Sequence, residues 1–149
     1  MRRVVITGMG ALTSLGPTSS ETFARLIAGE SGISPHPIYD LPVQVGSVAL
    51  DAHAHFSKMQ LLSLDRVSQL ALIAAEQAMH TADLTHSDID PLKMGVFWGT
   101  ASGGTESTEH AYASFFGVGG DRKKPLTVPA AMQHAPAAQI AMRFSIGGE

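Results

Sequence analysis

The sequence contains no cysteine among its 149 residues. This absence excludes disulfide bonds, thiolate metal sites and a cysteine nucleophile within the chain. No apolar run approaches the roughly 18–20 residues that a membrane-spanning helix needs. The apolar stretch that follows Arg3 is also too short for a secretory signal peptide. We therefore expect a cytoplasmic protein without a membrane partner.

Positive charge is also scarce. The formal net charge is −3 at pH 7, with 10 Lys and Arg residues against 13 Asp and Glu residues. General nucleic-acid binders usually carry a basic excess, so the composition argues against nucleic acid as a partner. Hydrophobic residues make up 44% of the chain, which suits one globular domain, or a large piece of one, over residues 1–149.

Short runs of β-branched and apolar residues predict strands. Residues 3–8 read RVVITG and close on glycine, a pattern typical of a strand that is covered on both faces. Residues 94–100 read MGVFWGT and predict a second buried strand. The imperfect alternation of Val43, Val45 and Val48 indicates a short strand between these two.

Apolar spacing of three and four residues predicts four helices. The first opens on Ser and Thr caps and closes on a glycine, and the last contains a proline that is expected to interrupt or kink it. Their ranges are 18–29, 63–82, 106–116 and 129–144. The order of strands and helices predicts an α/β layered sheet.

No motif forms a complete catalytic, metal or cofactor site. Gly8 and Gly10 follow a predicted strand as in dinucleotide-binding proteins, but Thr13 stands where that motif needs its third glycine, so a tight turn is the better interpretation. His53 and His55 lack a third ligand at a suitable spacing. Four aspartates show no catalytic pairing: Asp40, Asp51, Asp65 and Asp83. We predict no catalytic residue, no metal and no cofactor within these residues, and a nucleotide-binding oxidoreductase is disfavoured.

Three consecutive cations stand in a glycine-flanked loop: Arg122, Lys123 and Lys124. A short charge run of this kind is most often a solvated loop. It is also the most concentrated positive site in the sequence, and an acidic partner protein would be attracted to it.

Several stretches together resemble the opening of an elongating β-ketoacyl-acyl-carrier-protein synthase. Residues 2–10 (RRVVITGMG), 14–16 (SLG) and 26–33 (LIAGESGI) carry the specific part of the resemblance. Residues 99–104 (GTASGG) resemble the glycine-rich turn after the next core strand of that family. Residues 128–148 resemble the segment ahead of its catalytic site. The resemblance spans the chain and implies a thiolase-like α/β fold that is incomplete here.

The family resemblance also implies where the chemistry lies. In that family a strand after the last of these helices ends at the nucleophilic Cys, beyond Glu149, and two His residues follow much further on. The chain is therefore expected to be the front portion of the fold, with the remaining half as a partner. The complete enzyme would accept an acyl group from an acyl carrier protein and condense it with a decarboxylated malonyl unit, in fatty-acid or polyketide-type synthesis.

Two positions of the family's acyl tunnel carry small polar residues in this sequence. Ser102 falls at a tunnel-lining position that is often bulky and apolar, and Thr127 falls at a position, often aromatic, that reaches across the dimer. The resemblance thus implies a roomier or less apolar tunnel, unless the remaining half fills the space. It also implies a dimer, either of identical chains or with a related subunit.

The surface expected to dock the carrier protein has few basic residues in this sequence. Residues 57–66 fall where bacterial fatty-acid synthases cluster Lys and Arg for the acidic carrier, and only Lys58 and Arg66 are basic here. Docking is then expected at Arg122, Lys123 and Lys124, in the remaining half, or on another subunit. The alternative is a non-catalytic partner subunit, similar to the chain-length factors of polyketide systems.

Overall fold

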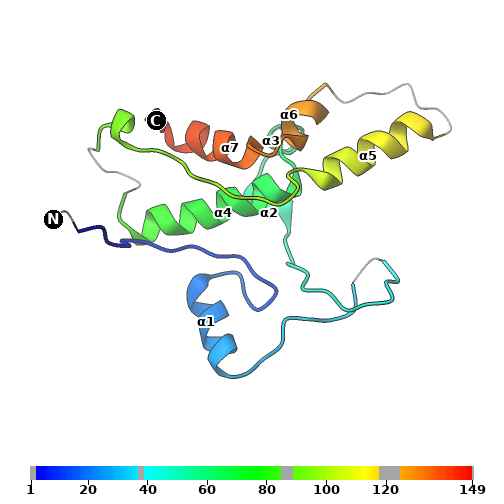
Figure 1. Cartoon of the computed structure of the whole chain (residues 1–149), viewed down its shortest axis with the longest axis horizontal. Helices are drawn as coiled ribbons and strands as arrows, with labels where there is room; N and C mark the ends of the chain where they lie inside the picture. The colour runs from blue at the N-terminus through cyan, green and yellow to red at the C-terminus, as the bar shows by residue number, and fades with distance from the viewer. Residues whose placement is uncertain (1–2, 37–38, 85–88, 118–124, 149) are drawn as a thin grey trace. The chain divides into compact units, whose positions relative to one another are not determined.

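The fold is seen in a computed structural model that describes residues 3–36, 39–84, 89–117 and 125–148. Figure 1 shows the course of the chain. The helices are α1 (Ser19–Ile27), α2 (Ala52–His55), α3 (Lys58–Leu61), α4 (Arg66–Thr81), the 3-10 helix η1 (Pro91–Lys93), α5 (Thr105–Phe116), α6 (Thr127–Ala131) and α7 (Ala135–Phe144). Among the described residues, no helix is long and apolar enough to cross a membrane.

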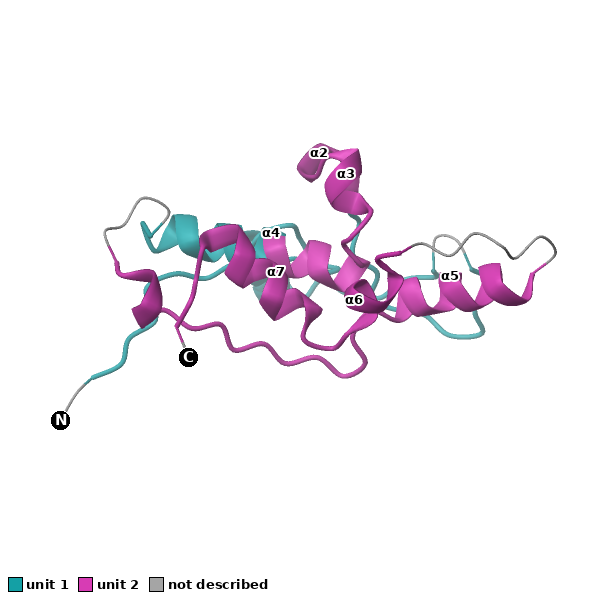
Figure 2. Ribbon diagram, turned by 90° about the horizontal axis from the view of Figure 1, so that it is seen from above, with its two compact units in different colours: residues 1–51, 73–87 teal, residues 52–72, 88–149 magenta. Residues whose placement is uncertain are grey.

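The chain divides into two compact units, which Figure 2 colours separately. Unit 1 comprises Met1–Asp51 and Ile73–Ser87, and unit 2 comprises Ala52–Leu72 and Asp88–Glu149. Helix α4 therefore contributes its first turns to unit 2 and its remaining turns to unit 1.

Helix α1 confirms the predicted start and end of the first helical segment. The Thr18 hydroxyl accepts a hydrogen bond from the Glu21 amide at 3.1 Å, as an N-cap residue does. At the other end, the Glu30 amide donates to the Arg25 carbonyl at 3.0 Å. Gly29, with φ of 73°, makes this turn possible because glycine adopts the left-handed region without a steric penalty.

In unit 1 the glycine turn after the first predicted strand packs directly on α4. A Cβ atom at Gly8 or Gly10 would collide with the carbonyl oxygens of Ala78 and Ala74. The Gln77 side chain accepts from the Ala11 amide at 3.1 Å and donates to the Pro17 carbonyl at 2.7 Å. These glycines therefore serve a close approach of the backbone to α4, and the bend of this segment lies further on, at residues 14–15.

The three predicted strands do not form within the described residues, and this corrects the prediction. Val4, Ile6 and Phe97 expose 97%, 83% and 92% of their surface. The bridge found in the described ranges is antiparallel and joins Ser34 to Val45. A strand obtains its hydrogen bonds from its neighbours, so a β-prone sequence that lacks neighbouring strands stays without a ladder.

Unit 2 contains most of the buried apolar side chains. They come from the segments around α3, α4, α6 and α7: Phe56, Leu64, Ala71, Leu72, Ala130, Ala135, Pro136 and Ile140. Small side chains allow helices to approach closely, which explains the alanines in this core.

The last predicted helix is two helices, α6 and α7, and Pro136 explains the interruption. The chain leaves the helical conformation at Met132, whose ψ is 141°, and re-enters it at α7, where Pro136 stands in the first turn. Proline clashes with the carbonyl four residues earlier, which here belongs to Met132, and it tolerates the first turn of a helix. The short helices α2 and α3 were not predicted.

Candidate functional site

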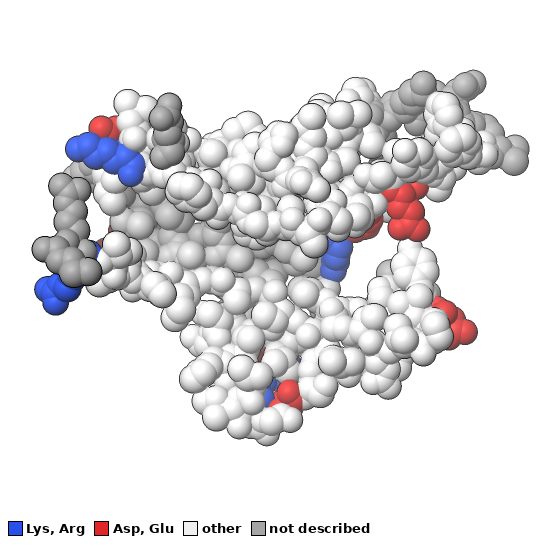
Figure 3. All heavy atoms as spheres, viewed as in Figure 1, with Lys and Arg blue, Asp and Glu red and all other residues white. Residues whose placement is uncertain are grey.

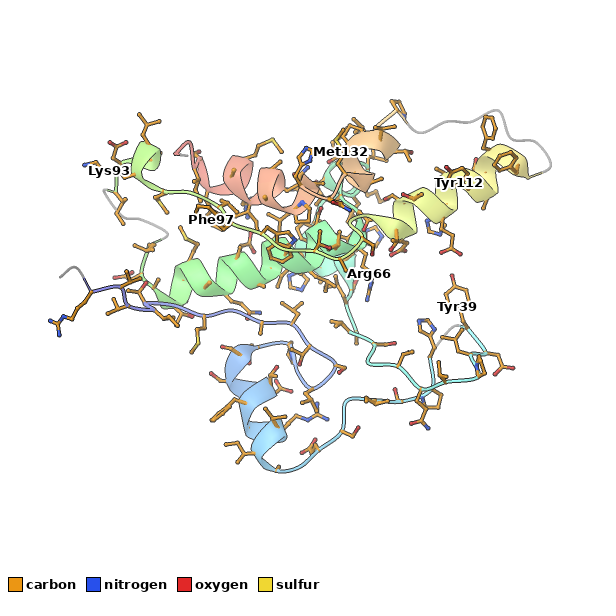
Figure 4. All side chains as sticks on the ribbon, viewed as in Figure 1. Tyr39, Arg66, Lys93, Phe97, Tyr112 and Met132 are labelled. Atoms are coloured by element: carbon orange, nitrogen blue, oxygen red, sulfur yellow. The ribbon has the colours of Figure 1, made fainter. Side chains whose placement is uncertain are left out.

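A groove with a volume of about 1140 Å³ lies within unit 2. Its walls come from α5, from α6 with the residue after it, and from the chain between α3 and the first turn of α4. Figure 4 labels one residue of each wall: Tyr112 on α5, Met132 after α6 and Arg66 at the start of α4. The groove is thus built from segments that are distant in sequence.

The apolar side chains of the groove concentrate on α5 and α6. The rings of Tyr112 and Phe116 stack with centroids 6.0 Å apart and planes 5° apart, and Phe115 meets Phe116 edge-on at 4.9 Å. Leu126, Val128 and Met132 line it from the α6 side. Tyr112 exposes 61% of its surface. A surface of this kind suits an apolar ligand or an apolar partner surface.

The polar end of the groove is organised by Asp65, whose surface is only 4% exposed. One carboxylate oxygen accepts from the Val67 amide at 3.0 Å, and the other accepts from the Ser107 amide at 2.8 Å. These amides belong to the first turns of α4 and α5. Asp65 therefore has a defined partner for each oxygen, which the sequence pattern did not reveal.

Two glycines let the start of α5 approach α6. Gly103 has φ of 68°, and its amide donates to the Thr100 hydroxyl at 3.3 Å. The Gly104 amide donates to the Ala131 carbonyl at 3.3 Å. A Cβ atom at Gly104 would lie 2.5 Å from the Ala130 carbonyl oxygen and 3.1 Å from Cγ of Asp65. The glycine-rich turn therefore serves close packing at the polar end of the groove.

The two predicted tunnel residues fall in different places. Thr127 is the first residue of α6 and lines the groove. Ser102 is exposed in the turn before α5 and is not among the groove-lining residues. The structure brings Thr127 to the groove and leaves Ser102 outside it, and the tunnel role of both residues stays a prediction.

The predicted docking residues Arg122, Lys123 and Lys124 lie outside the described residues. Residues 57–66, where the family places its carrier-docking cations, contain two basic residues. Lys58 is exposed at the start of α3, and Arg66 is half-buried and lines the groove. On the face drawn in Figure 3, the basic and acidic side chains are sparse and scattered. That face shows no concentrated positive patch among the described residues.

In the part of the chain that the structure covers, no group of three or more His, Asp or Glu side chains is placed to hold a metal ion. The chain has no cysteine to serve as a nucleophile. The lining of the groove, which is apolar on α5 and α6 and polar at Asp65, suits the binding and orientation of a ligand.

Comparison with known proteins gives the chain its family. The family model described as "Beta-ketoacyl synthase, N-terminal domain" matches residues 1–149. Nodulation protein E of Rhizobium meliloti (strain 1021) is 36% identical over 151 residues, which cover 99% of this chain and 38% of that protein. 3-Oxoacyl-[acyl-carrier-protein] synthase 2 of Staphylococcus aureus (strain N315) is 30% identical over 99% of this chain and 37% of that protein.

A third relative belongs to a polyketide system. The tetracenomycin polyketide synthase ketoacyl synthase beta subunit of Streptomyces glaucescens is 33% identical over 150 residues, which cover 97% of this chain and 37% of that subunit. The chain thus spans less than two fifths of the length of these three relatives.

Solved structures agree on the fold. A β-ketoacyl synthase from Burkholderia phymatum STM815 matches with a TM-score of 0.79 at 26% identity, over 100% of this chain and 38% of that one. The ishigamide ketosynthase/chain length factor matches with a TM-score of 0.85 at 24% identity, over 97% of this chain and 38% of that one, and shows the fold alone. The thiolase-like fold is therefore confirmed, although the strands are missing from the described residues. Since the family model covers the whole chain, the chain belongs to the β-ketoacyl synthase family and carries that family's N-terminal domain.

Proposed function

We propose that this chain is the front portion of a β-ketoacyl-acyl-carrier-protein synthase, an acyltransferase that makes carbon–carbon bonds by decarboxylative Claisen condensation. The observation that carries the proposal is the match of the β-ketoacyl synthase N-terminal domain to residues 1–149. The 30% identity to a 3-oxoacyl-[acyl-carrier-protein] synthase supports the same activity.

In this reaction the malonyl thioester loses CO₂, and the carbanion equivalent that forms attacks the carbonyl carbon of the acyl thioester. A carbon–carbon bond forms, the carbon–sulfur bond of the acyl thioester breaks, and the thiol leaves. This chain has no cysteine, so the nucleophilic Cys of such an enzyme would lie outside these 149 residues. The family resemblance implies that the two His residues lie outside them as well. The proposed contribution of this chain is to shape the acyl-binding space.

The groove of unit 2 supports this contribution. Its apolar wall on α5 and α6 suits an alkyl chain, and Thr127 lies in that wall. A threonine there leaves more volume than the aromatic residue common at this position in the family. We infer that the acyl group accepted is long, branched, unsaturated or polyketide-like, and that Ser102 joins the tunnel only in the complete fold.

The proposed partners follow from the same chemistry. The substrate arrives on an acyl carrier protein, with Arg122, Lys123 and Lys124 as the proposed docking site on this portion. The remaining half of the synthase fold completes the sheet. The complete protein is proposed to act in the cytoplasm as a homodimer, or as a heterodimer with a related subunit.

The test uses the full-length protein with acyl-carrier and malonyl-carrier thioesters. The expected result is release of CO₂ together with a β-ketoacyl-carrier product, which mass spectrometry of the carrier detects. Malonyl-carrier alone, without an acyl donor, is the control. Absence of both products with a range of acyl chains would reject an independent condensing enzyme.

The second candidate is a non-catalytic partner subunit that sets chain length. The observation that favours it is the 33% identity to a ketoacyl synthase beta subunit of a polyketide system. Such a subunit would be inactive alone and would restore condensation, with a defined product length, when mixed with a related ketosynthase. Co-purification of the pair and its activity would separate this candidate from the first.

A further inference from the structure

The Asp65 carboxylate joins the starts of two helices. One oxygen accepts from the Val67 amide in the first turn of α4, as expected for an N-cap residue. The other accepts at 2.8 Å from the Ser107 amide in the first turn of α5, 42 residues further along the chain. A single side chain thus fixes the separation of two helix N-termini.

Helix α5 depends on this contact because it has no side-chain cap of its own. Its N-cap residue is Gly104, and no side-chain hydrogen bond caps the helix from that position. The first amides of a helix need acceptors, and a negative charge at two helix N-termini is favourably placed. Asp65 is 4% exposed, so water does not replace it readily as the acceptor.

The contact also bears on the shape of the groove. Helix α5 supplies one whole wall, from Glu106 to Phe116, and Asp65 itself lies in the lining. Gly104 approaches Asp65 and the Ala130–Ala131 backbone so closely that a Cβ atom would lie 3.1 Å from Cγ of Asp65. The start of α5 is therefore held between Asp65 and α6.

We propose that Asp65 is a positioning residue that sets the place of α5, and through it the width of the groove and the selectivity for the acyl group. This inference rests on the proposed condensing function for its kinetic part. Asp65 touches no reacting atom in this proposal. It acts through the Ser107 amide.

The variant Asp65→Ser separates the two contacts. A serine hydroxyl reaches the Val67 amide as an ordinary N-cap and keeps the start of α4. It is too short to reach Ser107, so α5 loses its cap. Asp65→Asn is the second variant, because its amide group can accept from only one of the two backbone amides. Thr18→Ala is the matched control, since it removes the N-cap hydrogen bond of α1 in unit 1, remote in sequence from the groove residues.

In the full-length protein, Asp65→Ser should change the ratio of kcat/KM for long and short acyl-carrier substrates by about fivefold or more. Thr18→Ala should leave this ratio within about twofold, although it lowers thermal stability similarly. A ratio that is unchanged in Asp65→Ser, or that shifts equally in both variants, overturns the proposal. If Asp65→Ser fails to fold, Asp65→Asn is measured in the same way.

Hydrogen exchange gives a readout that does not depend on activity. Amides of residues 105–108 should exchange about tenfold faster in Asp65→Ser than in the parent protein, while residues 66–69 keep their protection. Thr18→Ala should leave both segments unchanged. If the parent protein proves inactive, the proposed function fails and this comparison still decides: faster exchange at the start of α5 supports the positioning role, and unchanged exchange overturns it.

Discussion

At the scale of single residues, the groove distinguishes the two tunnel residues expected from the family resemblance. Thr127 lines the groove from the first position of α6, and Ser102 is exposed in the turn before α5. Neither position is marked by its local sequence, because a small polar residue is ordinary at a helix start and in a turn. The surroundings of such a residue depend on segments that are distant along the chain.

We expect Thr127→Phe to shorten the acyl chains that the full-length enzyme accepts. An aromatic ring would occupy groove volume that the threonine leaves open. The value of kcat/KM should fall about tenfold for the longest accepted chain and change little for the shortest. Thr127→Val, which keeps the branched shape of threonine and adds no ring, is the control and should keep the parent profile. An unaltered chain-length profile in Thr127→Phe would mean that this wall does not bind the acyl chain.

The close packing around Gly104 is expected to contribute to the stability of the folded protein. In Gly104→Ala the new Cβ atom would lie 2.5 Å from the Ala130 carbonyl oxygen. This oxygen belongs to the backbone, so it cannot move aside by a change of side-chain rotamer. We expect the free energy of unfolding of the full-length protein to fall by about 1–3 kcal/mol, measured by denaturant titration. Gly99→Ala is the control, because none of the described residues lies within 4 Å of its Cβ position. Equal stability of the two variants would contradict the close approach of α5 to α6.

At the scale of elements, local signals predicted the longer helices and failed for the strands. Helices α1, α4 and α5 form where the apolar spacing placed them, and Pro136 breaks the last predicted helix. A helix makes its hydrogen bonds within one segment, so its sequence carries most of the information. The strand around Val4 and that around Phe97 need neighbours that these residues do not supply.

The site was less predictable than the helices. In the sequence, Asp65 is a carboxylate without a catalytic partner. Its contact with the start of α5 is made by the Ser107 amide, 42 residues away. The capping box of Ser57 and Gln60, which starts the short helix α3, is a local sequence signal of a helix start. Long-range contacts therefore account for what the sequence left undetermined, and only α3 had a readable local sign.

Gln77 provides the element-scale prediction, because it ties the 8–17 turn to α4 within unit 1. Gln77→Leu would leave the Ala11 amide and the Pro17 carbonyl without the partners they have at 3.1 and 2.7 Å. We expect a loss of about 1–2 kcal/mol in the unfolding free energy and faster amide exchange at Ala11. His80→Leu, an exposed change on the same helix, should stay within about 0.5 kcal/mol. A similar loss of unfolding free energy in both variants would show that the hydrogen bonds of the Gln77 side chain do not stabilise the fold specifically.

At the scale of the whole molecule, the uncovered apolar segments determine how residues 1–149 behave alone. Val4, Ile6 and Phe97 are almost fully exposed. We expect the isolated segment to aggregate or to lack a cooperative thermal transition, and to bind a hydrophobic dye that the full-length protein does not bind. Calorimetry and size-exclusion chromatography of both proteins measure this. A soluble monomer of 149 residues with a sharp cooperative transition would refute it.

The charge distribution of the whole molecule bears on the docking of the carrier protein. The carriers of this family are acidic, and a local positive run can attract such a partner even on a chain of net charge −3. Reversing Lys123 and Lys124 to Glu should raise KM for the acyl-carrier substrate about tenfold at low salt, and the difference from the parent should shrink as salt screens the charges. Small thioester mimics without a carrier should react normally, because only docking changes. Reversing the exposed Arg3 and Lys93 instead alters the net charge equally and should leave KM near the parent value. If the two double variants raise KM alike, net charge alone acts and the run is not a docking site. If neither raises KM, the carrier docks elsewhere than at this run.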